Sequence, residues 1–279
     1  MIAMDVAIVV DSSMDYPEDY KWQVPVHILP LRLYIDGQEY RDKFDINVDQ
    51  VYQYMLEGKK ILTSLPNMKE TTELLLDLCK KYSKVIVLTL SQKLSGTFNM
   101  VKTAVENFDL KDKVDLYDSR SVSGKFFYVL TRLVKDLVNG KSISQKNIDE
   151  YNKDAKIFMF LNDLEYLKKG GRIGKLSAFI GKVFNIKPIL SMNKDGELYK
   201  AKIVRNDKDL VESMVSLAKN FTAQMEDYVL YAGYGHQTMK KYVDEILSIF
   251  GKCDGLARVG PAVAVHAGPE IFGILVGRP

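Results

Sequence analysis

The stretch VIVLTL at residues 85–90, followed directly by SQKLSGTFN at 91–99, decides the fold of this chain. An unbroken run of apolar, mostly β-branched residues is typical of a strand buried on both faces of a parallel sheet. Ser95-Gly96-Thr97 then opens a predicted helix. Open α/β sheets bind ligands beyond the carboxyl ends of their strands, and a helix start suits an anionic group. Two interpretations stay open: a ligand-binding loop, or Ser95 acting only as the helix N-cap.

The first half of the chain alternates predicted strands with predicted helices. This alternation indicates βαβ units and a parallel sheet. Thr63 to Asn67 is predicted as a loop, and a single strand runs from His27 to Ile35. The other predicted strands cover 6–10, 85–90 and 114–117, and the helices cover 49–57, 69–82, a segment after Gly96, and 126–138.

The second half of the chain predicts an α+β arrangement. Segments 187–191 and 198–201 flank Asn193–Gly196, which is a hairpin signature. Strands are expected at 157–160, 228–232 and on both sides of a turn within 262–276, with helices at 164–169, 207–222 and 238–250. The polar stretch 140–154 is the expected join. We therefore expect an N-terminal α/β domain at 1–152 and a C-terminal domain at 153–279.

Composition excludes several classes of protein. The 279 residues include 39 basic and 36 acidic side chains, and a net charge of +3 is too balanced to indicate nucleic-acid binding. Cys79 and Cys253 form no CxxC motif and no disulfide framework, which favours a reducing compartment. With no signal peptide and no apolar run long enough for a bilayer, we expect a soluble, cytoplasmic protein.

Glycine-rich and metal-binding motifs give no cofactor site. GGRIGKLS at 170–177 resembles a phosphate loop, but its glycine spacing is one residue short and Leu176 stands where Ser or Thr is needed. No glycine-rich loop follows the first strand, and the three histidines lack metal-ligand spacing, so we expect neither a dinucleotide nor a metal. The lysines and arginine around this turn favour an acidic partner or a phosphate: Lys168, Lys169, Arg172, Lys175, Lys182 and Lys187.

Hydroxyl pairs and one histidine form the candidate ligand site. Thr63-Ser64 and Ser95-Gly96-Thr97 each precede a predicted helix, and His266 ends an apolar predicted strand. They are either helix caps and a core histidine, or a cluster of neutral donors for a carboxylate. Ser95 and His266 could also form the nucleophile and base of an esterase, although the Gly-x-Ser-x-Gly elbow and an acid partner are missing.

Taken in order, the motifs resemble the DegV family of bacterial lipid-binding proteins over nearly the whole chain. Each motif is short, and their order and spacing carry the resemblance. The motifs are Ile8–Ser13, Pro30-Leu31, Asp36-Gly37, Tyr40–Asp42, Thr63-Ser64 with Pro66, Ser91 with Leu94–Thr97, Asp118-Ser119, Leu164–Ile173, Lys187–Ile189 and His266 with Gly268-Pro269.

The resemblance implies two α/β domains with an apolar ligand tunnel between them and a fatty acid as the ligand. It implies carboxylate contacts from Thr63, Ser95 and His266, with Ser64, Gly96 and Thr97 lining the loops. It also implies a role as the lipid-binding subunit of a fatty acid kinase, which presents the acid to a separate ATP-binding subunit. Arg172 and Arg205 would then contact the phosphate or the partner. A lipid carrier without a kinase partner is the alternative.

Overall fold

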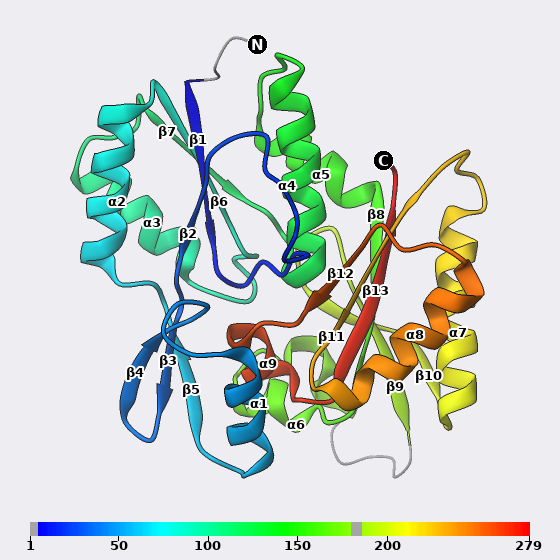
Figure 1. Cartoon of the computed structure of the whole chain (residues 1–279). Helices are drawn as coiled ribbons and strands as arrows, with labels where there is room; N and C mark the ends of the chain where they lie inside the picture. The colour runs from blue at the N-terminus through cyan, green and yellow to red at the C-terminus, as the bar shows by residue number, and fades with distance from the viewer. Residues whose placement is uncertain (1–4, 180–185) are drawn as a thin grey trace.

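The N-terminal part of the chain contains a four-stranded parallel sheet in the order β2-β1-β6-β7 (Figure 1). The computed structural model describes residues 5–179 and 186–279. Strand β6 lies inside the sheet and its residues 85–89 are buried, which confirms the prediction from the apolar run. Lys182 of the basic stretch lies outside the described residues. The strands are β1 (Val6–Asp11), β2 (Val26–Leu29), β6 (Lys84–Thr89) and β7 (Val114–Asp118).

Helices cover both faces of this sheet. Because strand side chains alternate, Val9 and Val87 pack against α2 and α3, whereas Ile8 and Leu88 pack against α4. Helix α5 occupies part of the predicted join and packs against α4, β7 and β8, and the domain division at 152/153 stays a prediction. The helices are α2 (Met68–Lys81), α3 (Thr97–Asn107), α4 (Ser123–Val138) and α5 (Gln145–Lys153).

A small antiparallel sheet in the order β4-β3-β5 corrects two predictions. The single strand expected at 27–35 is wrong, because Pro30 has no N–H for a ladder and the Leu31 N–H donates to Ser12 Oγ instead (3.0 Å). The loop expected at 63–67 is also wrong at its start, since Thr63 and Ser64 end strand β5. The elements are β3 (Arg32–Ile35), β4 (Gln38–Arg41), α1 (Val48–Leu56) and β5 (Ile61–Ser64).

The C-terminal part is a six-stranded mixed sheet in the order β10-β9-β8-β13-β11-β12. Strands β9 and β10 form the predicted hairpin. Phe158 and Phe160 face α7 and α8, whereas Ile157 and Met159 face α4. The elements are β8 (Ala155–Leu161), α6 (Glu165–Lys169), β9 (Lys187–Met192), β10 (Leu198–Val204), α7 (Asp207–Thr222), β11 (Val229–Tyr234), α8 (Lys240–Phe250), β12 (Gly255–Arg258) and β13 (Ile271–Gly277), with 3-10 turns at Gly174–Phe179 and Gln237–Met239.

The strand predicted before the final turn is instead helix α9 (Pro261–Ala267), and strand β12 was not predicted. Pro261 occupies the first helical turn, where its missing N–H costs nothing, and the alanines that follow favour a helix. Gly268 ends the helix with a φ of +85°, a conformation that suits glycine. His266 therefore lies in the last turn of a helix.

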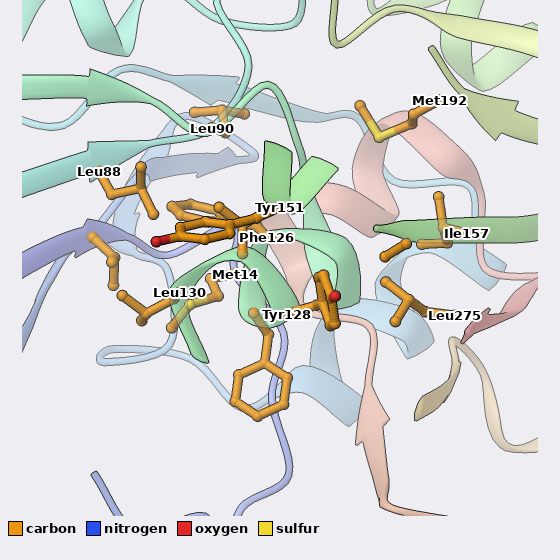
Figure 2. Packing of buried hydrophobic residues seen from close by; sticks show 14 of the residues in the cluster. Met14, Leu88, Leu90, Phe126, Tyr128, Leu130, Tyr151, Ile157, Met192 and Leu275 are labelled. Carbon is orange, nitrogen blue, oxygen red and sulfur yellow. The ribbon is translucent and has the colours of Figure 1, made fainter. Parts of the chain in front are cut away.

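A shared core joins the two parts of the molecule. Figure 2 shows Phe126 of α4 between Leu88 of β6 on one side and Ile157 and Leu275 of the C-terminal sheet on the other. The parallel N-terminal sheet and the mixed C-terminal sheet confirm the predicted fold class. None of the helices in the described ranges combines the length and the hydropathy of a membrane span.

Candidate functional site

A largely apolar cavity lies between the N-terminal and C-terminal parts. Its volume of about 340 Å³ is within the range of small-molecule sites. Loops beyond β1 and β6, the end of β5, helix α9 and the inner face of the C-terminal sheet all contribute to its wall. Apolar lining residues include Leu31, Leu90, Met159, Leu161, Leu167, Val263, Ile271 and Leu275.

Thr63 and His266 form a polar pair in the wall of this cavity. Thr63 Oγ1 and His266 Nε2 share a hydrogen bond of 2.6 Å. Thr63 comes from β5 and His266 from the last turn of α9, which packs against β5 and β3. The structure therefore brings together two of the three residues expected to contact a carboxylate, although they are 203 positions apart in the chain.

Burial keeps the His266 imidazole neutral. Desolvation, together with the nearby positive charge of Arg172, lowers the pKa of His266 to about 4. Its Nδ1 is buried without a hydrogen-bond partner among the described residues. A neutral imidazole offers one donor and one acceptor nitrogen. The unpartnered nitrogen is packed against Gly170.

Gly170 makes room for the His266 ring. A Cβ atom at position 170 would lie 2.2 Å from His266 Nδ1, much closer than a van der Waals contact allows. The φ of Gly170 is −75°, so its backbone conformation does not require glycine. The requirement is steric. The sequence carried no signal for this role of Gly170 beside the histidine.

Ser95 lines the cavity and also supports the start of α3. Ser95 Oγ lies 2.9 Å from Thr97 Oγ1 and accepts a hydrogen bond of 3.3 Å from the Thr97 N–H. The N-cap of α3 is Gly96, so the interpretation of Ser95 as the N-cap is wrong by one residue, although the Ser95 hydroxyl still contacts the first helical residue. Gly96 is exposed and Thr97 is buried behind Ser95, and neither is among the described residues of the cavity wall. Ser64 is exposed at the outer side and does line the cavity.

The two arginines occupy different surroundings. Arg172 is half-buried in the cavity wall, where its Nε–H donates to the Leu94 carbonyl (3.0 Å) and its Nη1–H donates to the Gly170 carbonyl. This side chain is therefore part of the cavity wall rather than of an exposed basic surface. Arg205 is exposed after β10 and lies outside the described wall. No group of three His, Cys, Asp or Glu side chains in the described residues is arranged to hold a metal ion.

A second hollow, of about 540 Å³, adjoins the polar pair. Thr63, Arg172 and His266 line this hollow as well as the cavity. Its remaining wall comes from α1, β5 and the α6 turn and carries the lysines Lys59, Lys60 and Lys169. A group held at Thr63 and His266 would therefore face apolar residues on one side and a basic surface on the other.

Comparison with known proteins identifies the family. A family model described as "Uncharacterised protein, DegV family" matches residues 5–278. The chain belongs to the DegV family. A DegV domain-containing protein of Clostridium acetobutylicum is 31% identical over 97% of this chain and 98% of that protein.

Two solved structures are similar to this chain over almost their whole length. A fatty-acid-binding DegV protein from Thermus thermophilus has a TM-score of 0.88 at 25% identity and covers 99% of this chain and 100% of that one. A stearic acid-binding protein from Eubacterium ventriosum has a TM-score of 0.85 at 28% identity and covers 97% of each chain. These matches agree with the fold of this DegV chain.

A second group of polar residues in the cavity wall was not predicted from the sequence. Ser13, Asp15 and Ser123 line the cavity at the start of α4 and beyond β1. The sequence carried part of the signal for this group, since polar residues directly follow the first strand. The loop before α4 gave no indication of a ligand site. We call these three residues the Asp15 site.

Proposed function

We propose that this DegV protein binds a long-chain fatty acid, with the carboxylate at Thr63, Ser95 and His266 and the acyl chain in the apolar cavity. One observation carries the proposal: the wall of an apolar cavity contains a hydrogen-bonded pair, Thr63 and His266, whose histidine is held neutral by burial. The fatty acids bound by the Thermus thermophilus and Eubacterium ventriosum relatives support the same ligand class.

The energetics of the cavity suit such a ligand. Each methylene buried from water contributes about 0.8 kcal/mol, so the acyl chain supplies most of the affinity. Neutral hydroxyl and imidazole donors orient the carboxylate without the desolvation cost of a fully buried opposite charge. Arg172 places a positive charge at the edge of this site, where the second hollow begins.

The esterase alternative gains no support from the hydrogen bonds. Ser95 Oγ is bonded to Thr97, and His266 Nε2 is bonded to Thr63. A nucleophile and its base must share a hydrogen bond for proton transfer, and within the described residues neither group bonds to the other.

Native mass spectrometry and titration with octadecanoate test fatty-acid binding. We expect a co-purified or added acyl chain in a one-to-one complex. Thr63→Val and His266→Gln each break the Thr63–His266 hydrogen bond, which leaves one O–H or N–H of the pair to donate to the carboxylate, and each is expected to weaken binding about tenfold. His236→Gln is the matched control, because His236 bonds to Thr238 outside the cavity. No bound acyl chain in the wild type, or equal binding by all variants, would contradict the proposal.

We further infer that the bound carboxylate is presented to a separate ATP-dependent kinase subunit. The observation that favours this over a simple carrier is the second hollow, which shares Thr63 and His266 with the cavity and carries Lys59, Lys60 and Lys169. Transfer of a phosphoryl group depends on positioning and on neutralising charge, and a basic surface beside the carboxylate suits both. Arg172 and Arg205 are the arginines proposed to contact the phosphate or the partner.

An acyl-phosphate assay tests presentation. The loaded protein, MgATP and the ATP-binding subunit of a bacterial fatty acid kinase are mixed, and acyl phosphate is trapped with hydroxylamine. The double variant Lys60→Ala/Lys169→Ala is expected to lower the yield about tenfold, since its side chains line only the outer hollow. Lys208→Ala, whose side chain is 83% exposed on α7, is the control. Equal yields from both variants would favour a carrier.

A further inference from the structure

The Asp15 site is a preorganised polar group inside the apolar cavity. Asp15 Oδ2 accepts the Ser123 hydroxyl over 2.6 Å, and Asp15 Oδ1 accepts the Gly260 N–H over 2.9 Å. Lys43 Nζ lies 3.3 Å from Oδ1 and balances the buried charge. Both carboxylate oxygens are thus occupied by donors, and the site is stable without a ligand.

The hydroxyls of the Asp15 site keep free acceptor capacity. Ser123 donates its only hydroxyl hydrogen to Asp15, and Ser13 donates its own to Asp11 Oδ1 (2.6 Å). A hydroxyl oxygen has two lone pairs, so each of these oxygens can still accept a hydrogen bond. The group that the site can take from the cavity is therefore a donor, such as a hydroxyl.

The backbone holds Ser123 in an uncommon conformation. Its φ is +55°, and its N–H donates to the Ser13 carbonyl (2.9 Å). Non-glycine residues rarely adopt this left-handed conformation, and such strain concentrates where a side chain must take one position. Here it directs the Ser123 hydroxyl to Asp15, next to Gly124 in the cavity wall.

Helix α9 sets the separation between the Asp15 site and the carboxylate site. Gly260, at its N-cap, donates to Asp15, and His266 lies in its last turn. Six residues at about 1.5 Å each place the two ends roughly 9 Å apart along the helix axis. An extended chain advances about 3.5 Å per three bonds, so about eight bonds of an acyl chain cover this distance.

We propose that the Asp15 site accepts a hydroxyl group in the middle of the acyl chain, so that the cavity takes mid-chain hydroxylated fatty acids as well as unsubstituted ones. The inference rests on the proposed function. A ligand hydroxyl buried in a fully apolar tunnel loses its hydrogen bonds to water without replacement. At this depth the Ser123 and Ser13 oxygens provide the replacement.

Competition binding with hydroxyoctadecanoic acids tests the inference. The series places the hydroxyl beside the carboxylate, about eight bonds from it, or at the far end of the chain. We expect the mid-chain isomer to bind about tenfold more tightly than the far-end isomer, since one hydrogen bond is worth about that factor. The ratio of the dissociation constants of octadecanoate and the mid-chain isomer is the principal measurement.

Ser123→Gly removes the hydroxyl while leaving a residue that suits the left-handed backbone. The variant is expected to bind the mid-chain isomer about tenfold more weakly relative to octadecanoate, so the ratio of the two dissociation constants changes about tenfold. Asp109→Gly, at an exposed turn with a φ of +51°, controls for glycine itself and should leave the ratio unchanged. If octadecanoate binds but the ratio is the same in the wild type, Ser123→Gly and Asp109→Gly, the inference about the Asp15 site is wrong while the proposed function stands. If no fatty acid binds, the proposed function fails.

Discussion

The two polar sites of the cavity satisfy their polar groups in opposite ways. At the carboxylate site, His266 has a nitrogen without a partner and a pKa lowered to about 4. At the Asp15 site, every carboxylate oxygen is paired with a donor. The difference teaches that a neutral group can stay unpaired until a ligand arrives, whereas a buried charge must be compensated within the fold.

Removing the charge of the Asp15 site is expected to have the largest effect. Asp15→Ala leaves Lys43 without its ion pair and the Gly260 N–H without its acceptor. The free energy of unfolding should fall by about 3–5 kcal/mol, as for other broken buried pairs. Urea denaturation measures it. Asp77→Ala breaks an exposed pair with Lys81 and should cost less than about 1 kcal/mol. If Asp15→Ala and Asp77→Ala lower the free energy of unfolding equally, the buried pair at Asp15 contributes no more to stability than an exposed ion pair.

The carboxylate site predicts a specific dependence of stability on pH. His266 is a base whose pKa falls from 6.5 to about 4 on folding, so the unfolded chain binds more protons between these values. Its contribution to stability is present above pH 6.5 and is lost as the pH falls toward 4. The loss is about 3 kcal/mol at 1.36 kcal/mol per pKa unit. Urea denaturation of wild type and His266→Gln at pH 7 and pH 4 measures it.

The buried Asp11 carboxyl beside the Asp15 site should act in the opposite direction. Burial raises its pKa from 3.8 to about 6, despite hydrogen bonds from Ser13 and Leu90, so the folded state binds more protons in that window. Its contribution is present at low pH and is lost as the pH rises through 4 to 6. The free energy of unfolding of the wild type minus that of His266→Gln, taken at each pH, isolates the contribution of the histidine, because Asp11 is present in both proteins. A difference that does not change with pH would show that His266 is not held neutral by burial.

Adding a side chain at Gly170, next to His266, should have the smallest effect on the free energy of unfolding. It should directly weaken fatty-acid binding. Gly170→Ala displaces the His266 ring, because the new Cβ would overlap Nδ1. We expect octadecanoate to bind about tenfold more weakly, which is about 1.4 kcal/mol. Gly96→Ala is the control, since its Cβ would meet only Leu65 at an ordinary 3.7 Å. A stronger effect at Gly96 would restore the sequence-based assignment of that residue to the ligand.

Much of the fold could be predicted because its signals are local. The buried runs of β1 and β6, the amphipathic helices and the β9–β10 hairpin all lie within short windows of sequence. The predictions were wrong where distant packing decides the conformation. The apolar residues of α9 have no clear period over seven positions, and they form a helix that packs against α1, α6 and β5. Strand β12 is short, and among the described strands it pairs only with β11.

By itself the sequence determined the class of sheet, the loop after β6 and the kinds of polar side chain available to a ligand, since strand burial and helix starts are local properties. Only the tertiary structure decided which of these side chains meet. Thr63 and His266 lie 203 positions apart and touch because α9 packs on the small sheet. Asp15 and Gly260 meet through the other end of the same helix, and such long-range contacts depend on the packing of the whole chain.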